Sequence, residues 1–130
     1  MKKKLKILSI YIISLIFIIP FLFTNCTNTE APIVDYLELD EAGPWTLKVS
    51  AVLLDNGGEI PSELGFCCSI NYEPSIDSCY VKCKVLDHAL GNFTGVLAGL
   101  IPDTNYLVKA YAINYEGIGY SRPIFVSTKK

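Results

Sequence analysis

Residues 100–120 read LIPDTNYLVKAYAINYEGIGY, and this stretch decides the fold of the chain. It begins with a Leu-x-Pro-x-Thr-x-Tyr corner that ends at Tyr106, continues as a strand over residues 105–115, and closes in a glycine-containing turn. This order is typical of the late strands of an immunoglobulin-type sandwich, where a tyrosine hydroxyl at a corner bonds to nearby backbone. We therefore expect Tyr106 to be a structural tyrosine corner.

Short alternating segments separated by turn residues fill the chain from Ile33 onward, without a long run of helical periodicity. Alternation of apolar and polar residues favours antiparallel sheets that each keep one wet face. The spacing of the segments is that of an all-β sandwich, and Pro123 makes the last strand an edge strand. We expect seven strands, at residues 33–39, 45–54, 64–70, 79–86, 93–97, 105–115 and 120–128.

Two stretches resemble a known family. GGEIPSELGFCCSINYEPSI, residues 57–76, and NFTGVLAGLIPDTNYLVKAYAINYEGIGY, residues 92–120, resemble the fibronectin type III-like modules of Bacteroidetes cell-envelope lipoproteins. The second stretch follows the family's Gly-Leu-x-Pro-x-Thr-x-Tyr corner and its Val-Arg-Ala-Tyr-Ala-x-Asn strand. The resemblance implies an immunoglobulin-like, fibronectin type III-like antiparallel sandwich over residues 33–130. It also implies an extracytoplasmic lipoprotein with an interaction or spacer role.

The N-terminus has the pattern of an export signal. Four lysines within residues 2–6 precede an apolar run from Ile7 to Phe23, and positive charge followed by an apolar segment directs a chain across the membrane. We therefore expect residues 1–25 to be a signal peptide and the rest of the chain to be extracytoplasmic, in the cell envelope. The run is longer than the usual apolar part of a signal peptide and only slightly short of the roughly 20 residues that span a bilayer, so an uncleaved helical anchor stays an alternative.

Cys26 follows the apolar run directly, in the sequence Leu22-Phe23-Thr24-Asn25-Cys26. This sequence resembles the lipobox of bacterial lipoprotein precursors, which implies that Cys26 is lipidated and anchors the chain to the membrane, most simply the outer membrane. Two acyl chains are enough for stable attachment. A free Cys26 in a secreted protein is the remaining alternative. In the lipidated protein, residues 26–32 are the lipidated cysteine and a short tether.

The charge of the mature chain disfavours nucleic-acid binding. The chain has 11 Lys and Arg against 13 Asp and Glu, and the signal removes four of the basic residues. Seven basic residues then face thirteen acidic ones, a formal charge of −6. An acidic module without a basic stripe repels phosphate backbones.

Four further cysteines, Cys67, Cys68, Cys79 and Cys83, raise the question of disulfides and metals. Consecutive Cys67 and Cys68 point to opposite faces of a strand, which disfavours convergence on one metal. A disulfide from Cys68 to Cys83 or Cys79 on the neighbouring strand is one prediction, since an oxidising compartment permits it. Buried unpaired thiols are the other prediction. We expect no metal and no other cofactor.

No catalytic arrangement is visible in the sequence. His88 is the only histidine and lies in a polar turn with no nucleophile placed beside it by any known motif. A hydrolase is disfavoured because no Ser/His/Asp or paired-carboxylate arrangement is visible.

The outward side of the strand over residues 105–115 is the candidate ligand face. Tyr111 and Tyr115 would lie there, flanked by Tyr80 if the strands adjoin. Such a face either stacks on sugar rings or anchors a protein, or only stabilises the exposed sheet through aromatic pairs. The expected function is a non-catalytic, membrane-anchored interaction or spacer module. The alternative is a glycan-binding surface lipoprotein that uses the tyrosine face.

Overall fold

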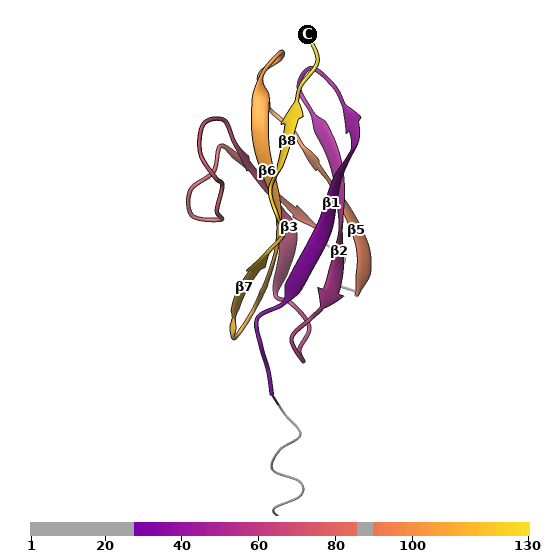
Figure 1. The fold of residues 1–130 in the computed structure, drawn as a ribbon, viewed down its shortest axis with the longest axis vertical. Coiled ribbons are helices and arrows are strands. Elements are labelled where there is room, and N and C mark those ends of the chain that lie inside the picture. Colours follow the sequence, from indigo (N-terminus) through magenta and orange to yellow (C-terminus); the bar gives the residue numbers. More distant parts are fainter. Residues whose placement is uncertain (1–27, 86–89) are drawn as a thin grey trace, which may run out of the picture.

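Two antiparallel sheets face each other across an apolar core in the computed structural model, which describes residues 28–85 and 90–130 (Figure 1). One sheet has the strand order β1-β2-β5. The other has the order β4-β3-β6-β7, and β8 also pairs with β6. The strands are β1 (Ile33–Ala42), β2 (Leu47–Asp55), β3 (Glu63–Ser69), β4 (Val81–Val85), β5 (Gly91–Leu97), β6 (Asn105–Asn114), β7 (Gly117–Tyr120) and β8 (Ile124–Ser127). The predicted antiparallel sandwich is confirmed, and the described residues contain no helix.

The core is built by the alternation that the sequence shows. Each sheet presents every second side chain to the other, and burying a Leu, Val or Phe contributes about 1.5–3 kcal/mol. Phe66 of β3 and Phe93 of β5 join the two sheets, with ring centroids 5.1 Å apart. Gly95 makes room for this contact, because a Cβ there would lie 2.8 Å from the Phe66 ring. The inward residues of β2 and β6 are Leu47, Val49, Ala51, Leu53, Tyr106, Val108, Ala110 and Ala112, all 0–2% exposed.

The tyrosine corner forms as the sequence predicts. The backbone N–H of Ile101 donates a hydrogen bond of 2.8 Å to the hydroxyl of Tyr106, whose side chain is fully buried. The preceding residue, Leu100, donates its N–H to the carbonyl of Trp45 at 3.0 Å. The corner therefore fastens the beginning of β6 to the turn between β1 and β2, in the opposite sheet.

The described residues form eight strands and not seven, because Gly117–Tyr120, which was expected to be part of a glycine-containing turn, forms the extra strand β7, and the expected strand over residues 120–128 is shortened to β8. β7 pairs with Tyr111–Asn114 and β8 pairs with Asn105–Val108. Between them, the Ser121 hydroxyl accepts a hydrogen bond of 2.9 Å from the N–H of Ala110, in place of a backbone carbonyl. Pro123 has no N–H to continue a ladder. The edge therefore breaks in the middle and pairs with β6 as two short pieces.

Replacing Tyr106 by Phe tests the corner. The change removes the acceptor of the Ile101 N–H and keeps the ring, so we expect the free energy of unfolding to fall by about 1–3 kcal/mol. Urea denaturation measures this loss. Tyr115→Phe is the matched control, because Tyr115 is 96% exposed, and its effect should stay within about 0.5 kcal/mol. Equal stabilities of the two variants would contradict the structural role of the corner.

Candidate interaction surface

Tyr111 is buried, and the expectation that it lies on an exposed face is wrong. Its side chain is 0% exposed, and its hydroxyl donates a hydrogen bond of 3.0 Å to Glu63 Oε2. The reason is Gly65, which is its register partner on β3. A Cβ at Gly65 would lie 2.6 Å from the Tyr111 hydroxyl, so the ring lies over the glycine instead of pointing into solvent. Burial, together with the Glu63 carboxylate, raises the pKa of Tyr111 above its ordinary value.

The other two tyrosines of the predicted face lie at opposite ends of β6. The ring of Tyr80 lies 6.0 Å from the ring of Tyr106, at the beginning of β6. Tyr115 follows the last residue of β6. A strand of this length extends about 30 Å at about 3.3 Å per residue. Tyr80, Tyr111 and Tyr115 therefore do not form one face, and the glycan-binding alternative loses the platform on which it was based.

Cys67, Cys68, Cys79 and Cys83 are all free thiols. The strand register explains why the predicted Cys68–Cys83 bridge does not form: Cys68 pairs with Val81, whereas Cys83 pairs with Phe66. The two cysteines are thus diagonal neighbours, whose Cα atoms are about 7–8 Å apart in an antiparallel pair. That separation exceeds the usual range for a disulfide.

Cys67 and Cys68 are both fully buried, on opposite faces of β3. Burial raises the pKa of Cys67 from 9.0 to about 12 and that of Cys68 to about 11. These thiols therefore stay protonated at neutral pH and act as small apolar side chains.

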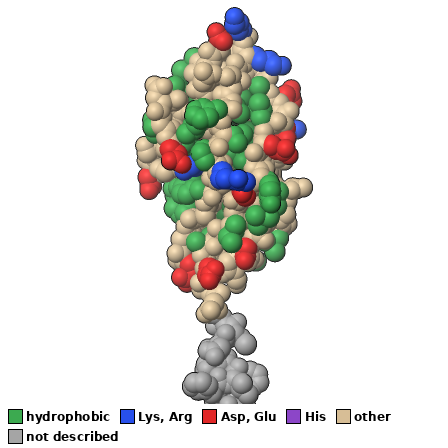
Figure 2. Space-filling view, viewed as in Figure 1, with side chains coloured by type: hydrophobic (Ala, Val, Ile, Leu, Met, Phe, Trp, Pro, Cys, Tyr) green, Lys and Arg blue, Asp and Glu red, His purple; other side chains and the backbone are tan. Residues whose placement is uncertain are grey.

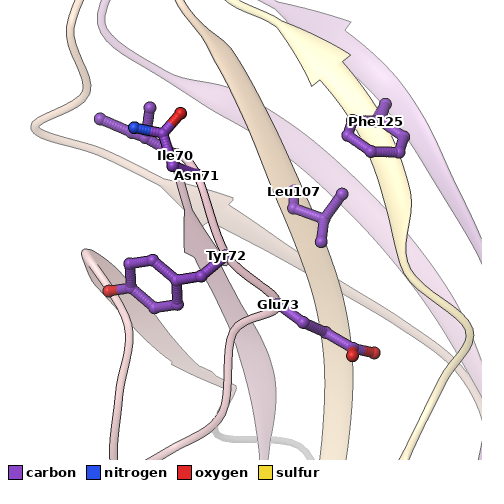
Figure 3. A pocket seen from close by; sticks show the side chains of 6 residues that line it. All are labelled: Ile70, Asn71, Tyr72, Glu73, Leu107 and Phe125. Atoms are coloured by element: carbon purple, nitrogen blue, oxygen red, sulfur yellow. The ribbon is translucent and has the colours of Figure 1, made fainter.

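A hollow of about 380 Å³ lies on the outer side of the second sheet, between the segment that follows β3 and the strands β6 and β8 (Figure 3). Leu107 and Phe125 form a cross-strand pair on its floor. Phe125 is 84% exposed and Tyr72 is 48% exposed. The lining residues are Ile70, Asn71, Tyr72, Glu73, Leu107 and Phe125. We refer to the hollow lined by these six residues as the outer hollow.

The wall of the outer hollow is held against the sheet by polar contacts. Lys109 of β6 forms an ion pair with Glu73 at 2.6 Å, and its Nζ lies 5.1 Å from the centre of the Tyr120 ring. The Tyr120 hydroxyl accepts a hydrogen bond of 3.1 Å from the N–H of Ile76. The segment after β3 is therefore tied to both β6 and β7, so the exposed rings lie on a fixed support.

Alternation along the strand over residues 105–115 places Leu107 on its outward side, together with Tyr111, whereas the sequence pattern does not identify Tyr72 or Phe125. Residues 124–126 are all apolar, so alternation in the sequence does not show which of them faces outward; in the structure Val126 is buried and Phe125 faces outward. Tyr72 lies in a loop, where no periodicity indicates direction. The predicted signal peptide, Cys26 and His88 lie outside the described residues.

Neither a metal centre nor a membrane-crossing helix is found in the described part of the chain. Within residues 28–85 and 90–130, no group of three or more His, Cys, Asp or Glu side chains is arranged to hold a metal ion. The same residues contain no helix with the length and apolar character needed to cross a membrane.

Comparison with known proteins supports the fold. No protein-family profile and no curated protein sequence matches the chain. Among solved structures, the third fibronectin III domain of the human KIAA0343 protein is similar with a TM-score of 0.57 and 14% identity, over 82% of this chain and 90% of that one. A fibronectin III domain of human collagen XX gives 0.52 and 16%, over 81% and 100%. A structure described as that of a myokine gives 0.54 and 17%, over 78% and 99%.

These identities are low, so the likeness concerns the fold alone. The described domain is a fibronectin type III-like sandwich, as the resemblance in the sequence implies. Its hollow and its exposed side chains are features of this chain, and a shared fold does not by itself bring a shared function.

The buried thiols predict how stability depends on pH. The unfolded chain releases these protons near the ordinary pKa of 9.0, whereas the folded chain keeps them until about pH 11 to 12. Stability is therefore fully present below about pH 9 and falls as the pH rises above it, by on the order of 1–3 kcal/mol for each buried thiol at pH 11. Urea denaturation between pH 7 and 11 measures the fall.

A Cys67→Ala variant provides the comparison for that experiment. Its unfolding free energy should decline less steeply above pH 9 than that of the original chain, while Tyr106 and Tyr111, whose pKa values burial also raises, keep part of the decline. A stability that stays constant up to pH 11 would show that the thiols are not buried.

Proposed function

We propose that this chain is a non-catalytic, membrane-anchored extracytoplasmic module that spaces its C-terminal end from the membrane and offers the outer hollow for interaction. The observation that carries the proposal is the placement of the two ends. The chain reaches β1 at one end of the sandwich, and the C-terminus lies at the opposite end (Figure 1). A module with this geometry keeps its N-terminal attachment and its C-terminus apart by the length of the sandwich.

The anchoring part of the proposal rests on the sequence. Residue 28 lies only two positions after Cys26, which comes directly after the apolar run Ile7–Phe23 and two polar residues. A lipid on Cys26, or a retained apolar helix, would in either case attach the membrane at the same end of the sandwich. The spacer geometry is therefore the same for both modes of anchoring.

The interaction part of the proposal rests on the outer hollow. Tyr72 and Phe125 expose aromatic rings on a braced support, and aromatic side chains at a concave surface are common anchors for protein partners. The solved structures that resemble this chain include fibronectin III domains, and their sandwich architecture is common among cell-surface domains, which supports a non-catalytic module.

A Cys26→Ala variant tests the anchoring. We expect the original chain to be recovered in the membrane fraction with a diacylglyceryl mass on an N-terminal Cys26, and the variant to lose both the mass and the cleavage. Mass spectrometry of the purified fraction measures this. Cys79→Ala is the control and should behave like the original chain. An intact Met1 in the original chain would instead show a helical anchor.

A further inference from the structure

Thr29 and Glu30, which lie just before β1, are fastened to the sandwich, whereas the sequence predicts a simple tether there. The N–H of Glu30 donates a hydrogen bond of 2.9 Å to the carbonyl of Gly57. The Asn114 side chain donates one of 2.6 Å to the Glu30 carbonyl. Thr29 donates its hydroxyl to Glu116 at 2.8 Å. The backbone contact is so close that a Cβ at Gly57 would lie 1.8 Å from the Glu30 carbonyl oxygen.

This fastening limits how far the sandwich can lie from its anchor. Only three peptide steps separate Cys26 from Thr29, and a fully extended chain spans at most about 3.3–3.6 Å per residue. If Cys26 carries lipid at the bilayer surface, Thr29 lies within about 10 Å of that surface. The turns that hold Thr29 and Glu30 must then reach the lipid headgroups.

These turns expose apolar side chains at their tips. Tyr115, between β6 and β7, is 96% exposed, and Ile60, between β2 and β3, is 76% exposed. Both line a hollow of about 220 Å³, together with Glu59, Ser62 and Asn114. The Glu59 carboxylate accepts a hydrogen bond of 2.6 Å from the N–H of Tyr115, so the two turns are held together. Tyrosine is favoured where one side of a ring is apolar and the other wet, as at a membrane interface.

The charge around these tips selects the type of lipid. Glu59 and Glu116 lie in the two turns, Glu30 lies in the segment that they hold, and none of the three forms an ion pair within the described residues, where the four ion pairs involve Asp35, Glu63 and Glu73. In Figure 2 acidic side chains lie near the end where the chain enters, and the basic side chains lie farther along the molecule. Three carboxylates repel an anionic surface and attract the ammonium groups of a zwitterionic one.

We propose that this end of the sandwich, with Tyr115 and Ile60 at its tips, rests on a zwitterionic, ammonium-bearing lipid surface and holds the module upright on the membrane. The inference depends on the membrane anchoring proposed above. It adds that the sandwich has a fixed orientation on the membrane and that its Tyr115 and Ile60 end contacts the lipid.

The chain contains a natural reference for testing this contact. Trp45 is the only tryptophan, is 61% exposed, and lies between β1 and β2 at the far end of the sandwich. The length of β2, nine residues, separates it from the tips by about 30 Å at about 3.3 Å per residue. A Tyr115→Trp, Trp45→Phe double variant moves the single tryptophan from the far end to the proposed contact. An Ile60→Trp, Trp45→Phe variant does the same on the second tip.

The three full-length, membrane-anchored proteins are reconstituted into phosphatidylethanolamine–phosphatidylcholine vesicles that contain lipids brominated in the upper acyl chain. Flotation first establishes that each protein is attached. We expect the tryptophan at position 115 or 60 to lose emission to the bromolipid and to shift to shorter wavelength, whereas Trp45 stays unquenched. In vesicles rich in anionic lipid the quenching at both tips should be weaker.

Each outcome is decisive. Attached protein without quenching at positions 115 and 60, or with equal quenching of Trp45, overturns the proposed contact and leaves the anchoring intact. Stronger quenching in anionic vesicles overturns the choice of a zwitterionic surface. Protein that does not float contradicts the anchoring itself.

Discussion

One side chain, that of Asn114 at the end of β6, holds together three parts of the chain that lie far apart in the sequence. Its amide nitrogen donates to the carbonyls of Glu30 and Asn56, at 2.6 and 3.1 Å. Its amide oxygen accepts from the N–H groups of Glu116 and Gly117, at 2.8 and 3.2 Å. All four hydrogen-bonding positions of the amide are thus used, and the side chain is nearly buried, which makes the contact costly to break. The incoming chain, the β2–β3 turn and the β6–β7 turn are therefore one unit.

This constraint supports the proposed spacer role. A sandwich on a loose tether would turn freely above the membrane. Its length would then not fix the distance between the membrane and the C-terminus. In the proposed membrane-anchored module, fastening Thr29 and Glu30 would remove that freedom and make the long direction of the sandwich the direction of the spacer. The outer hollow, which lies along β6 and β8, is then presented to the side at a fixed height. The Tyr106 corner stabilises the other end of the same strand, so β6 connects both ends of the module.

The alternation of apolar residues and the corner motif were enough to predict the two-sheet fold and the inward face of β6. They failed where the outcome depends on a residue from another strand. Tyr111 is buried because Gly65 lies opposite it, and no local pattern shows which strand will supply that partner. The break between β7 and β8 depends on the Ser121 hydroxyl replacing a backbone acceptor, which the apolar pattern does not record.

The candidate sites were predictable to different degrees for the same reason. Leu107 follows from alternation along a strand, whereas Phe125 lies in a run of apolar residues that does not alternate. Tyr72 depends on how a loop is held against the sheet by the Lys109–Glu73 ion pair. The importance of Asn114 was weakly predictable, because the family that this sequence resembles also ends this strand in Asn. The contact of Asn114 with Glu30 was not predictable, because Glu30 belongs to a segment whose composition is typical of a tether. Whether Cys68 of β3 and Cys83 of β4 form a disulfide could not be predicted from the sequence. The register of the two strands decides whether these cysteines are opposite or diagonal neighbours.

Backbone ¹⁵N relaxation of the full-length chain tests the fastened segment most directly. The account predicts that the amides of Thr29, Glu30 and Ala31 have order parameters like those of β1, about 0.85. Values below about 0.6, as in a free tail, would show that the segment is not held and would contradict an oriented spacer.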